Sequence, residues 1–199
     1  MSNVVAIAAG GDYDCALALQ SNGTVVRLLT GSPMPNGLSN ITAIAVSEGR
    51  DLPDLALRHD GTVVLLTEGV GQSEMRPPPG LSNVVGIAAG YTHYLALKRD
   101  GTVFGWGGNA NGEVTGTASQ WAAGLAAPGG TILSNVVAIA ASQGFSVALK
   151  REGTVVAWGQ NARGQTDVPA GLSGVVSIAV GWQHCLAITT NTSGLVIGK

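Results

Sequence analysis

The chain has 199 residues, of which 45% are hydrophobic and 11% are charged, and its formal net charge is −2. This balance argues against sequence-independent nucleic-acid binding, which needs a basic surface. No stretch approaches the roughly 18 uninterrupted apolar residues of a membrane-spanning helix, so we predict neither a nucleic-acid partner nor a membrane span.

The charged fraction is low, since a typical soluble domain carries about 25%. Two explanations are open. Either the strands are buried on both faces, or a partner or further copies of the chain cover part of the outer surface.

The N-terminal residues lack the basic segment and longer apolar run of a signal peptide. The chain is therefore either cytoplasmic or a mature extracellular chain whose signal has been removed.

Five copies of one unit, each of about forty residues, make up the sequence. Each copy opens on a short apolar run such as Val84–Ala89, preceded by Ser-Asn or Ser-Gly. The β-branched residues and the flanking glycines predict a buried strand. We predict a single repeat domain, with units at 2–37, 38–80, 81–132, 133–171 and 172–199.

A predicted β-hairpin follows each opening strand. In the third unit, alternating runs at 94–98 and 102–106 flank Asp100-Gly101. Asp-Gly between alternating runs is a strong hairpin signal, because glycine adopts the positive φ of a tight turn without strain. Units three and four then continue into Trp106-Gly-Gly-Asn and Trp158-Gly-Gln-Asn, which units one and two replace with Leu-Leu-Thr.

The recurring phrases Val-x-Ile-Ala-Ala-Gly, Leu-Ala-Leu-Lys-x-Asp-Gly-Thr-Val and Trp-Gly-x-Asn-x-x-Gly-Gln resemble the repeat of the regulator of chromosome condensation family. The resemblance covers nearly the whole chain and is most specific in units three and four. It implies an all-β propeller whose repeats each supply one blade or parts of two adjacent blades. The short unit is similar to the compact repeats of bacterial relatives.

The resemblance also implies guanine-nucleotide exchange on a small GTPase and docking on chromatin. The sequence has no match to a dedicated exchange loop and no basic face. Members of the family usually close with seven blades, whereas this chain has five units. We therefore expect either a closed five-blade ring or an open arc that assembles with copies of itself or belongs to a longer parent. The last unit lacks the Asn-x-x-Gly-Gln segment and the chain opens directly on a first strand, which favours the arc.

Stacking small sheets around an axis buries both of their faces. The paired alanines of the opening strands, such as Ala88 and Ala89, are expected near the crowded centre. Trp106 and Trp158 are expected further out, where neighbouring blades diverge and more volume must be filled.

Departures from the repeat supply the candidate partner-binding residues. Unit two has an insertion at 47–54 that contains Arg50 and Asp51. A cation or sugar site is conceivable there, but the insertion lacks the ordered spacing of a calcium loop, so we predict a solvated loop. Residues 107–133 form an enlarged loop in unit three that holds Gln120 and Trp121. Trp121 is either an exposed anchor or tucked under its own loop.

Trp182 is the other candidate anchor, and it directly precedes Gln183-His184. His93 and His184 occupy equivalent positions. They could form part of a metal site, but two histidines without a third ligand make a weak case. We predict instead that these histidines form hydrogen bonds with the backbone at the start of a strand.

Cys15 and Cys185 are predicted to be small buried residues, although a bridge between the chain ends is conceivable. Residues 75–79 read as a passive, stiff connector.

No catalytic motif is present, neither a Gly-x-Ser-x-Gly elbow nor a phosphate-binding loop. We therefore predict a non-catalytic propeller scaffold that binds another protein and needs no cofactor. Two alternatives remain open. One is a structural subunit that self-assembles into a ring, fibre or surface layer. The other is a secreted carbohydrate binder that uses Trp121 or Trp182.

Overall fold

The computed structural model describes residues 3–10, 15–28, 34–49, 52–66, 73–190 and 196–197. Over these residues the chain forms five small antiparallel sheets, one from each sequence unit. Two short 3₁₀ helices, η1 (Ser73–Met75) and η2 (Pro128–Gly130), lie between strands, and neither is long or apolar enough to cross a membrane. The fold is thus the predicted all-β architecture.

The strands of each sheet follow one another in chain order. The first sheet is β1 (Val4–Gly10), β2 (Cys15–Gln20) and β3 (Val25–Arg27), and the second is β4 (Ile41–Ala45), β5 (Leu55–Arg58) and β6 (Val63–Leu65). The third is β7 (Val84–Ala89), β8 (His93–Lys98), β9 (Val103–Gly108) and β10 (Trp121–Leu125). The fourth is β11 (Val136–Ser142), β12 (Phe145–Lys150) and β13 (Val155–Gly159), and the fifth is β14 (Val175–Gly181), β15 (His184–Thr189) and β16 (Val196–Ile197).

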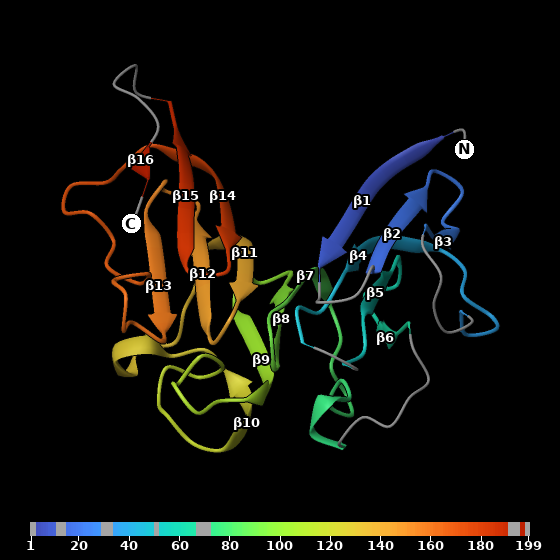
Figure 1. Ribbon diagram of the computed structural model, residues 1–199, viewed down its shortest axis with the longest axis horizontal. Coiled ribbons are helices and arrows are strands. Elements are labelled where there is room, and N and C mark those ends of the chain that lie inside the picture. Colours follow the sequence, from blue (N-terminus) through green and yellow to red (C-terminus); the bar gives the residue numbers. More distant parts are fainter. Residues whose placement is uncertain are drawn as a thin grey trace.

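The five sheets lie along an arc (Figure 1). The first strands of successive sheets contact one another, β1 with β4, β4 with β7, β7 with β11 and β11 with β14. These strands therefore form the hub, and Ala88, Ala89 and Ala141 are buried there as expected. The first sheet, in blue, and the fifth sheet, in red, stand on opposite sides of the opening of the arc.

One backbone hydrogen bond recurs between consecutive sheets. The hairpin turn after the second strand presents a glycine carbonyl, which accepts the N–H of the residue that opens the next sheet. The bonds are Ile41 to Gly23 (3.4 Å), Val84 to Gly61 (3.3 Å), Val136 to Gly101 (3.0 Å) and Val175 to Gly153 (3.1 Å). The glycines of the Asn-Gly, Asp-Gly and Glu-Gly hairpin turns thus also connect neighbouring sheets.

The core between consecutive sheets repeats position by position, and we call each such set of aliphatic residues a socket. A socket comprises a residue from the second strand, a valine from the third strand, the leucine that precedes the next sheet, and an isoleucine and an alanine from that sheet. The members are Leu17, Val25, Leu38, Ile44 and Ala56; Leu55, Val63, Leu81, Ile87 and Ala96; and Leu95, Val103, Leu133, Ile139 and Ala148.

Each of these sockets holds one large side chain from the end of the later sheet's third strand. Leu66 occupies the first socket, Trp106 the second and Trp158 the third, and all three are buried. The prediction that the tryptophans fill the volume between blades is confirmed.

Two predictions about connecting segments were wrong. Residues 107–133 are not merely a loop, because β10 pairs with β9, Trp121 opposite Gly108, as a fourth strand. The segment at 75–79 is not passive, because Met75 is buried and its carbonyl accepts a hydrogen bond of 3.1 Å from Trp106 Nε1. In both places, tertiary contacts with the third sheet order a segment that lacks a repeat pattern.

Candidate functional site

The described turns between the first and second strands of the second to fifth sheets occupy equivalent positions in the repeat, and we call their residues the hub face. Its described residues are 47–49, 52–54, 90–92, 143–144 and 182–183. Hydrogen bonds connect the turn of the second sheet to that of the third, and the turn of the third to the end of β11. Glu48 N–H and Ser47 Oγ both donate to the carbonyl of Gly90, each at 3.2 Å, and Tyr91 N–H donates to the carbonyl of Ser142 at 3.4 Å.

Glu48 connects two sheets that are not neighbours. Its carboxylate accepts a hydrogen bond of 2.9 Å from Ser142 Oγ, so the second sheet is linked directly to the fourth across the hub. Burial raises the pKa of Glu48 above its usual value, and the hydrogen bond from Ser142 partly offsets that effect. The hub face therefore contains a partly buried carboxyl group that accepts a hydrogen bond across the hub.

Two aromatic residues lie at equivalent positions of the hub face. Tyr91 follows β7 and is 38% exposed, and Trp182 follows β14 and is 64% exposed. The tight turns hold both side chains on rigid elements. Trp182, one of the predicted anchors, is thus a large aromatic side chain open to solvent on an ordered surface.

Trp121 is not an exposed anchor. It lies in β10 and packs, half-buried, against the core cluster that contains Trp106. Gln120, immediately before it, is exposed, and its carbonyl accepts a hydrogen bond of 3.2 Å from Asn109 N–H. The structure therefore supports the second interpretation of Trp121, in which the side chain packs against the protein and is not an exposed anchor. Arg50 and Asp51 lie outside the described residues.

The insertion in unit two is not simply a solvated loop. Ser47 and Asp54 are buried, and Asp54 Oδ1 accepts a hydrogen bond of 3.0 Å from Ser47 N–H. Asp54 also pairs with Arg27 of the first sheet at 3.7 Å. The reason is that the segment crosses the hub, where its polar groups are enclosed between the first and third sheets.

The two equivalent histidines have different surroundings. His93 is fully buried, and its Nε2 lies 2.9 Å from Ser146 Oγ of the fourth sheet. Ser146 donates its own hydrogen to the carbonyl of Glu113 at 2.7 Å, so it accepts from His93 Nε2–H. The predicted backbone bond is therefore replaced by a side-chain bond between sheets. His184 is exposed, and the described residues contain no group of three potential metal ligands.

Sequence reasoning missed the structural role of the Asn-x-x-Gly-Glu/Gln segment. In the third sheet, Asn109 Oδ1 accepts from Val114 N–H at 2.8 Å and Glu113 Oε2 accepts from Asn111 N–H at 2.7 Å. The fourth sheet repeats the arrangement, with Asn161 Oδ1 bound to Thr166 N–H and Gln165 Oε1 bound to Arg163 N–H. The recurrence of Asn and Glu/Gln at fixed spacing was the signal that could have revealed it.

The same segment also contacts the next sheet. Ser146 of the fourth sheet donates to the carbonyl of Glu113, and Cys185 Sγ of the fifth donates to the carbonyl of Gln165 at 3.3 Å. Cys185 is a free, half-buried thiol whose pKa burial raises to about 11. It is therefore protonated at neutral pH. The side chain of Cys15 lies outside the described part of the chain.

Comparison with known proteins agrees with this architecture. The family model of the regulator of chromosome condensation (RCC1) repeat matches residues 84–113 and 136–165, which lie in the third and fourth sheets. Protein pim1 of Schizosaccharomyces pombe is 24% identical over 144 residues, which cover 57% of this chain and 27% of pim1.

Solved structures show the same fold. Prp20p from Saccharomyces cerevisiae superposes with a TM-score of 0.67 at 21% identity, over 94% of this chain and 56% of that one. The ectodomain of the Arabidopsis thaliana receptor kinase ACR4 gives 0.63 at 17% identity, over 98% and 63%. The chain thus spans between about a quarter and two thirds of the length of these proteins. Residues 84–113 and 136–165 thus match the RCC1 repeat, and the five sheets share the fold of these solved structures.

Proposed function

We propose that this chain is a propeller scaffold that binds another protein through its hub face, with Trp182 as the principal anchor. The observation that carries the proposal is the 64% exposure of Trp182 on an ordered turn. Tryptophan and tyrosine are enriched among the residues that dominate binding energy at protein interfaces. A solvent-exposed tryptophan on a rigid turn loses little conformational entropy when a partner covers it.

Tyr91 and Glu48 extend the proposed surface. Tyr91 occupies the equivalent turn of the third sheet, and Glu48 N–H donates to the carbonyl of Gly90 beside it. A partner that contacts Trp182 and Tyr91 together would meet two aromatic groups, each on a tight turn. Such preorganisation favours specific binding, because few groups must be ordered on association.

Similar proteins of known structure support a protein-binding role for this fold. Prp20p has been described with its binding properties to Gsp1p and histones, and yeast RCC1 (Prp20) has been crystallised with Kap60. Both comparisons are below 25% identity, so they suggest that propellers of this type offer protein-binding surfaces and do not identify the partner of this chain.

A photocrosslinking experiment tests the proposal. A benzophenone amino acid is placed at Tyr91, and crosslinked partners of the otherwise unchanged chain are quantified beside those of Trp182→Ala and Ile132→Ala. Ile132 is a matched control, because it is 51% exposed but follows η2, away from the hub turns. We expect Trp182→Ala to reduce recovery of a specific partner at least about tenfold and Ile132→Ala to leave it unchanged. Equal recovery with all three chains would refute the proposal.

Self-assembly is a second candidate, and a separate observation favours it. Ile7 of the first sheet is 77% exposed and Ile188 of the fifth sheet is 56% exposed. Their counterparts in the intervening sheets are covered by a neighbouring sheet, as Leu97 and Leu149 illustrate for Ile188. The outer faces of the first and fifth sheets thus carry aliphatic side chains of the kind that, elsewhere in the fold, are buried between two sheets.

Sedimentation velocity over a wide range of protein concentration tests this second candidate. We expect the chain to associate and Ile188→Asp to weaken that association, because a carboxylate would be buried without a partner. Ile132→Asp adds the same charge away from the end sheets and should not. A chain that stays monomeric at every concentration would exclude self-assembly. Carbohydrate binding remains a prediction from the sequence.

A further inference from the structure

The first sheet exposes side chains that the later sheets bury. Val4, the residue that opens it, is 40% exposed, whereas its counterparts in the later sheets are only 3% or 4% exposed: Ile41, Val84, Val136 and Val175. Leu28 is also exposed, although the large side chains at its position are buried in the next three sheets: Leu66, Trp106 and Trp158. Ile7 has the same position in the first sheet as the isoleucines of the three sockets. The first sheet therefore presents the side chains with which each later sheet packs against the sheet before it.

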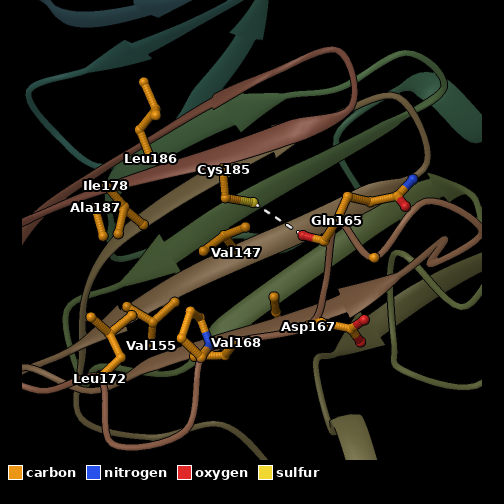
Figure 2. A pocket seen from close by; sticks show the side chains of 13 residues that line it. Val147, Val155, Gln165, Asp167, Val168, Leu172, Ile178, Cys185, Leu186 and Ala187 are labelled. Atoms are coloured by element: carbon orange, nitrogen blue, oxygen red, sulfur yellow. Dashed lines mark hydrogen bonds between the residues drawn. The ribbon is translucent and has the colours of Figure 1, made fainter. Parts of the chain in front are cut away.

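The fifth sheet exposes the opposite kind of face. Ile178 and Ala187 of this sheet lie beside Val155 and Leu172, on the side of the fourth sheet, as Figure 2 shows. Because successive side chains of a strand point to opposite faces, Ile188 points away from the fourth sheet, and it is exposed. The leucines at its position in the four earlier sheets are all buried: Leu19, Leu57, Leu97 and Leu149. The fifth sheet therefore presents the face on which each earlier sheet receives the next one.

These two faces already pair with each other four times within the chain. At each junction, the second-strand leucine belongs to the same core cluster as the residue that opens the next sheet: Leu19 with Ile41, Leu57 with Val84, Leu97 with Val136, and Leu149 with Val175. The end sheets carry β-branched aliphatic residues at both of these positions, Ile188 on the fifth and Val4 on the first. The two faces are therefore complementary in the way that consecutive sheets are, whereas two first sheets or two fifth sheets would bring together faces that do not meet inside the chain.

The complementary faces of one copy do not meet each other, because the first and fifth sheets stand on opposite sides of the opening of the arc (Figure 1). We propose that the fifth sheet of one copy packs against the first sheet of a second copy, in the register that joins consecutive sheets inside the chain. Ile188 of one copy then lies against Val4 and Ile7 of the other, and the burial of apolar surface drives the association. This inference rests on the second candidate function, self-assembly, and names the two faces that meet.

The contact is head-to-tail, so a copy that uses one face keeps the other face free. Such heterologous contacts generate rings where the rotation closes and filaments where it does not. A symmetric dimer, in which both copies use the same face, would stop at two copies. The polarity of the contact is therefore the property that an experiment must determine.

A mixing experiment with two variants tests this polarity. Ile7→Asp alters the face of the first sheet and Ile188→Asp that of the fifth. Each variant alone should associate at least about tenfold more weakly than the unaltered chain, because a carboxylate would be buried without a partner. A mixture of the two should form a complex of one copy of each that grows no further, since the intact fifth sheet of Ile7→Asp can receive the intact first sheet of Ile188→Asp. Sedimentation velocity gives the size of the complex, and native mass spectrometry with one variant labelled with ¹⁵N gives its composition.

Val176→Asp is the matched control on the fifth sheet. Val176 is as exposed as Ile188, but its counterparts Val85 and Val137 are exposed in the inner sheets too, so this position does not lie between sheets. The control should associate as the unaltered chain does.

Three outcomes would overturn the proposal. If either Ile7→Asp or Ile188→Asp alone associates as strongly as the unaltered chain, copies do not meet through these two faces, although self-assembly itself would stand. If the unaltered chain associates but the mixture of folded variants, checked by circular dichroism, stays monomeric, the pairing is wrong and self-assembly again stands. A monomeric unaltered chain would overturn both the pairing and self-assembly.

Discussion

Gly101 in the hairpin turn of the third sheet lies directly against Asn135, which immediately precedes the fourth sheet. A Cβ atom at Gly101 would stand 3.2 Å from the backbone nitrogen of Asn135. Gly101 has a φ of 80° and Asn135 a φ of 59°, so both residues adopt the left-handed conformation that glycine and asparagine tolerate best. The turn and the start of the next sheet therefore depend on these residue types for their close approach.

Replacement of Gly101 with alanine should destabilise the protein through this contact. Gly171→Ala is the matched control, because Gly171 has a φ of 82° but no described atom within 4 Å of the position a Cβ would take. We expect Gly101→Ala to lose about 1–2 kcal/mol more of the free energy of unfolding than Gly171→Ala. Urea denaturation measures both. Equal losses would mean that backbone strain alone matters and that the inter-sheet contact relaxes.

His93 should make the fold sensitive to acid. Burial lowers its pKa from 6.5 to about 3, so between these values the unfolded chain binds more protons than the folded one. Stability is therefore complete above pH 6.5 and falls as the pH drops towards 3, by at most about 1.4 kcal/mol per pH unit. Phe145 occupies the equivalent position in the fourth sheet, which makes His93→Phe a substitution that the repeat accommodates.

Denaturation midpoints at neutral and acid pH test this prediction. His93→Phe should keep a larger fraction of its neutral stability at pH 4 to 5 than the unaltered chain does. His184→Phe, at the exposed equivalent position, should leave the acid dependence unchanged. An identical acid dependence in His93→Phe and the unaltered chain would show that the buried imidazole does not control it.

Glu113 should affect the pH dependence of stability in the direction opposite to that of His93. Burial raises the pKa of its carboxyl above 4.5, against the hydrogen bonds from the backbone and side chain of Asn111. The folded chain then binds the proton more tightly than the unfolded one, so this group costs stability as the pH rises from 4.5 through its folded pKa. Gln165 makes the equivalent hydrogen bond without a charge.

Glu113→Gln should therefore be more stable than the unaltered chain at pH 7, with the difference shrinking towards pH 4.5. Glu113→Ala removes the hydrogen bond to Asn111 N–H as well and should lose stability at both pH values. Thermal or urea unfolding at the two pH values distinguishes these outcomes. A Glu113→Gln variant that is less stable at pH 7 would contradict the expected cost of the charge.

The two socket tryptophans should respond differently to phenylalanine. Trp106 Nε1 donates to the carbonyl of Met75 at 3.1 Å, whereas Trp158 Nε1 is buried with no hydrogen-bond partner among the described residues. Both substitutions remove ring volume, but only Trp106→Phe also breaks a described hydrogen bond. We expect it to cost about 1 kcal/mol more of the free energy of unfolding than Trp158→Phe. Equal costs in urea denaturation would indicate that Met75 finds another donor.

Much of the fold was readable from the repeat pattern. The Asp-Gly turn at Gly101, the apolar run from Val84 and the hairpin strands around them are local features, and each matches a strand or turn in the structure. The burial of Trp106 and Trp158 followed from the packing needs of adjacent blades. The strand at Trp121 could not be predicted, because its pairing with β9 depends on the loop that Asn109 organises through side-chain hydrogen bonds.

The candidate functional residues also divide into those that the sequence revealed and those that only the structure revealed. Trp182 was singled out from the sequence as a candidate anchor, and the structure leaves it exposed. Glu48 and Ser142 could not be connected from the sequence, since they belong to sheets two and four and meet only across the hub.

The sequence by itself determined the repeated unit, the strands, the turns and the residues that face neighbouring sheets, because these follow from local periodicity and from the φ preferences of glycine and asparagine. Only the tertiary structure decided which polar groups meet across the hub and which of two equivalent histidines is buried. These properties depend on how the sheets are placed side by side, and residues at the same position of the repeat differ there because their neighbouring sheets differ.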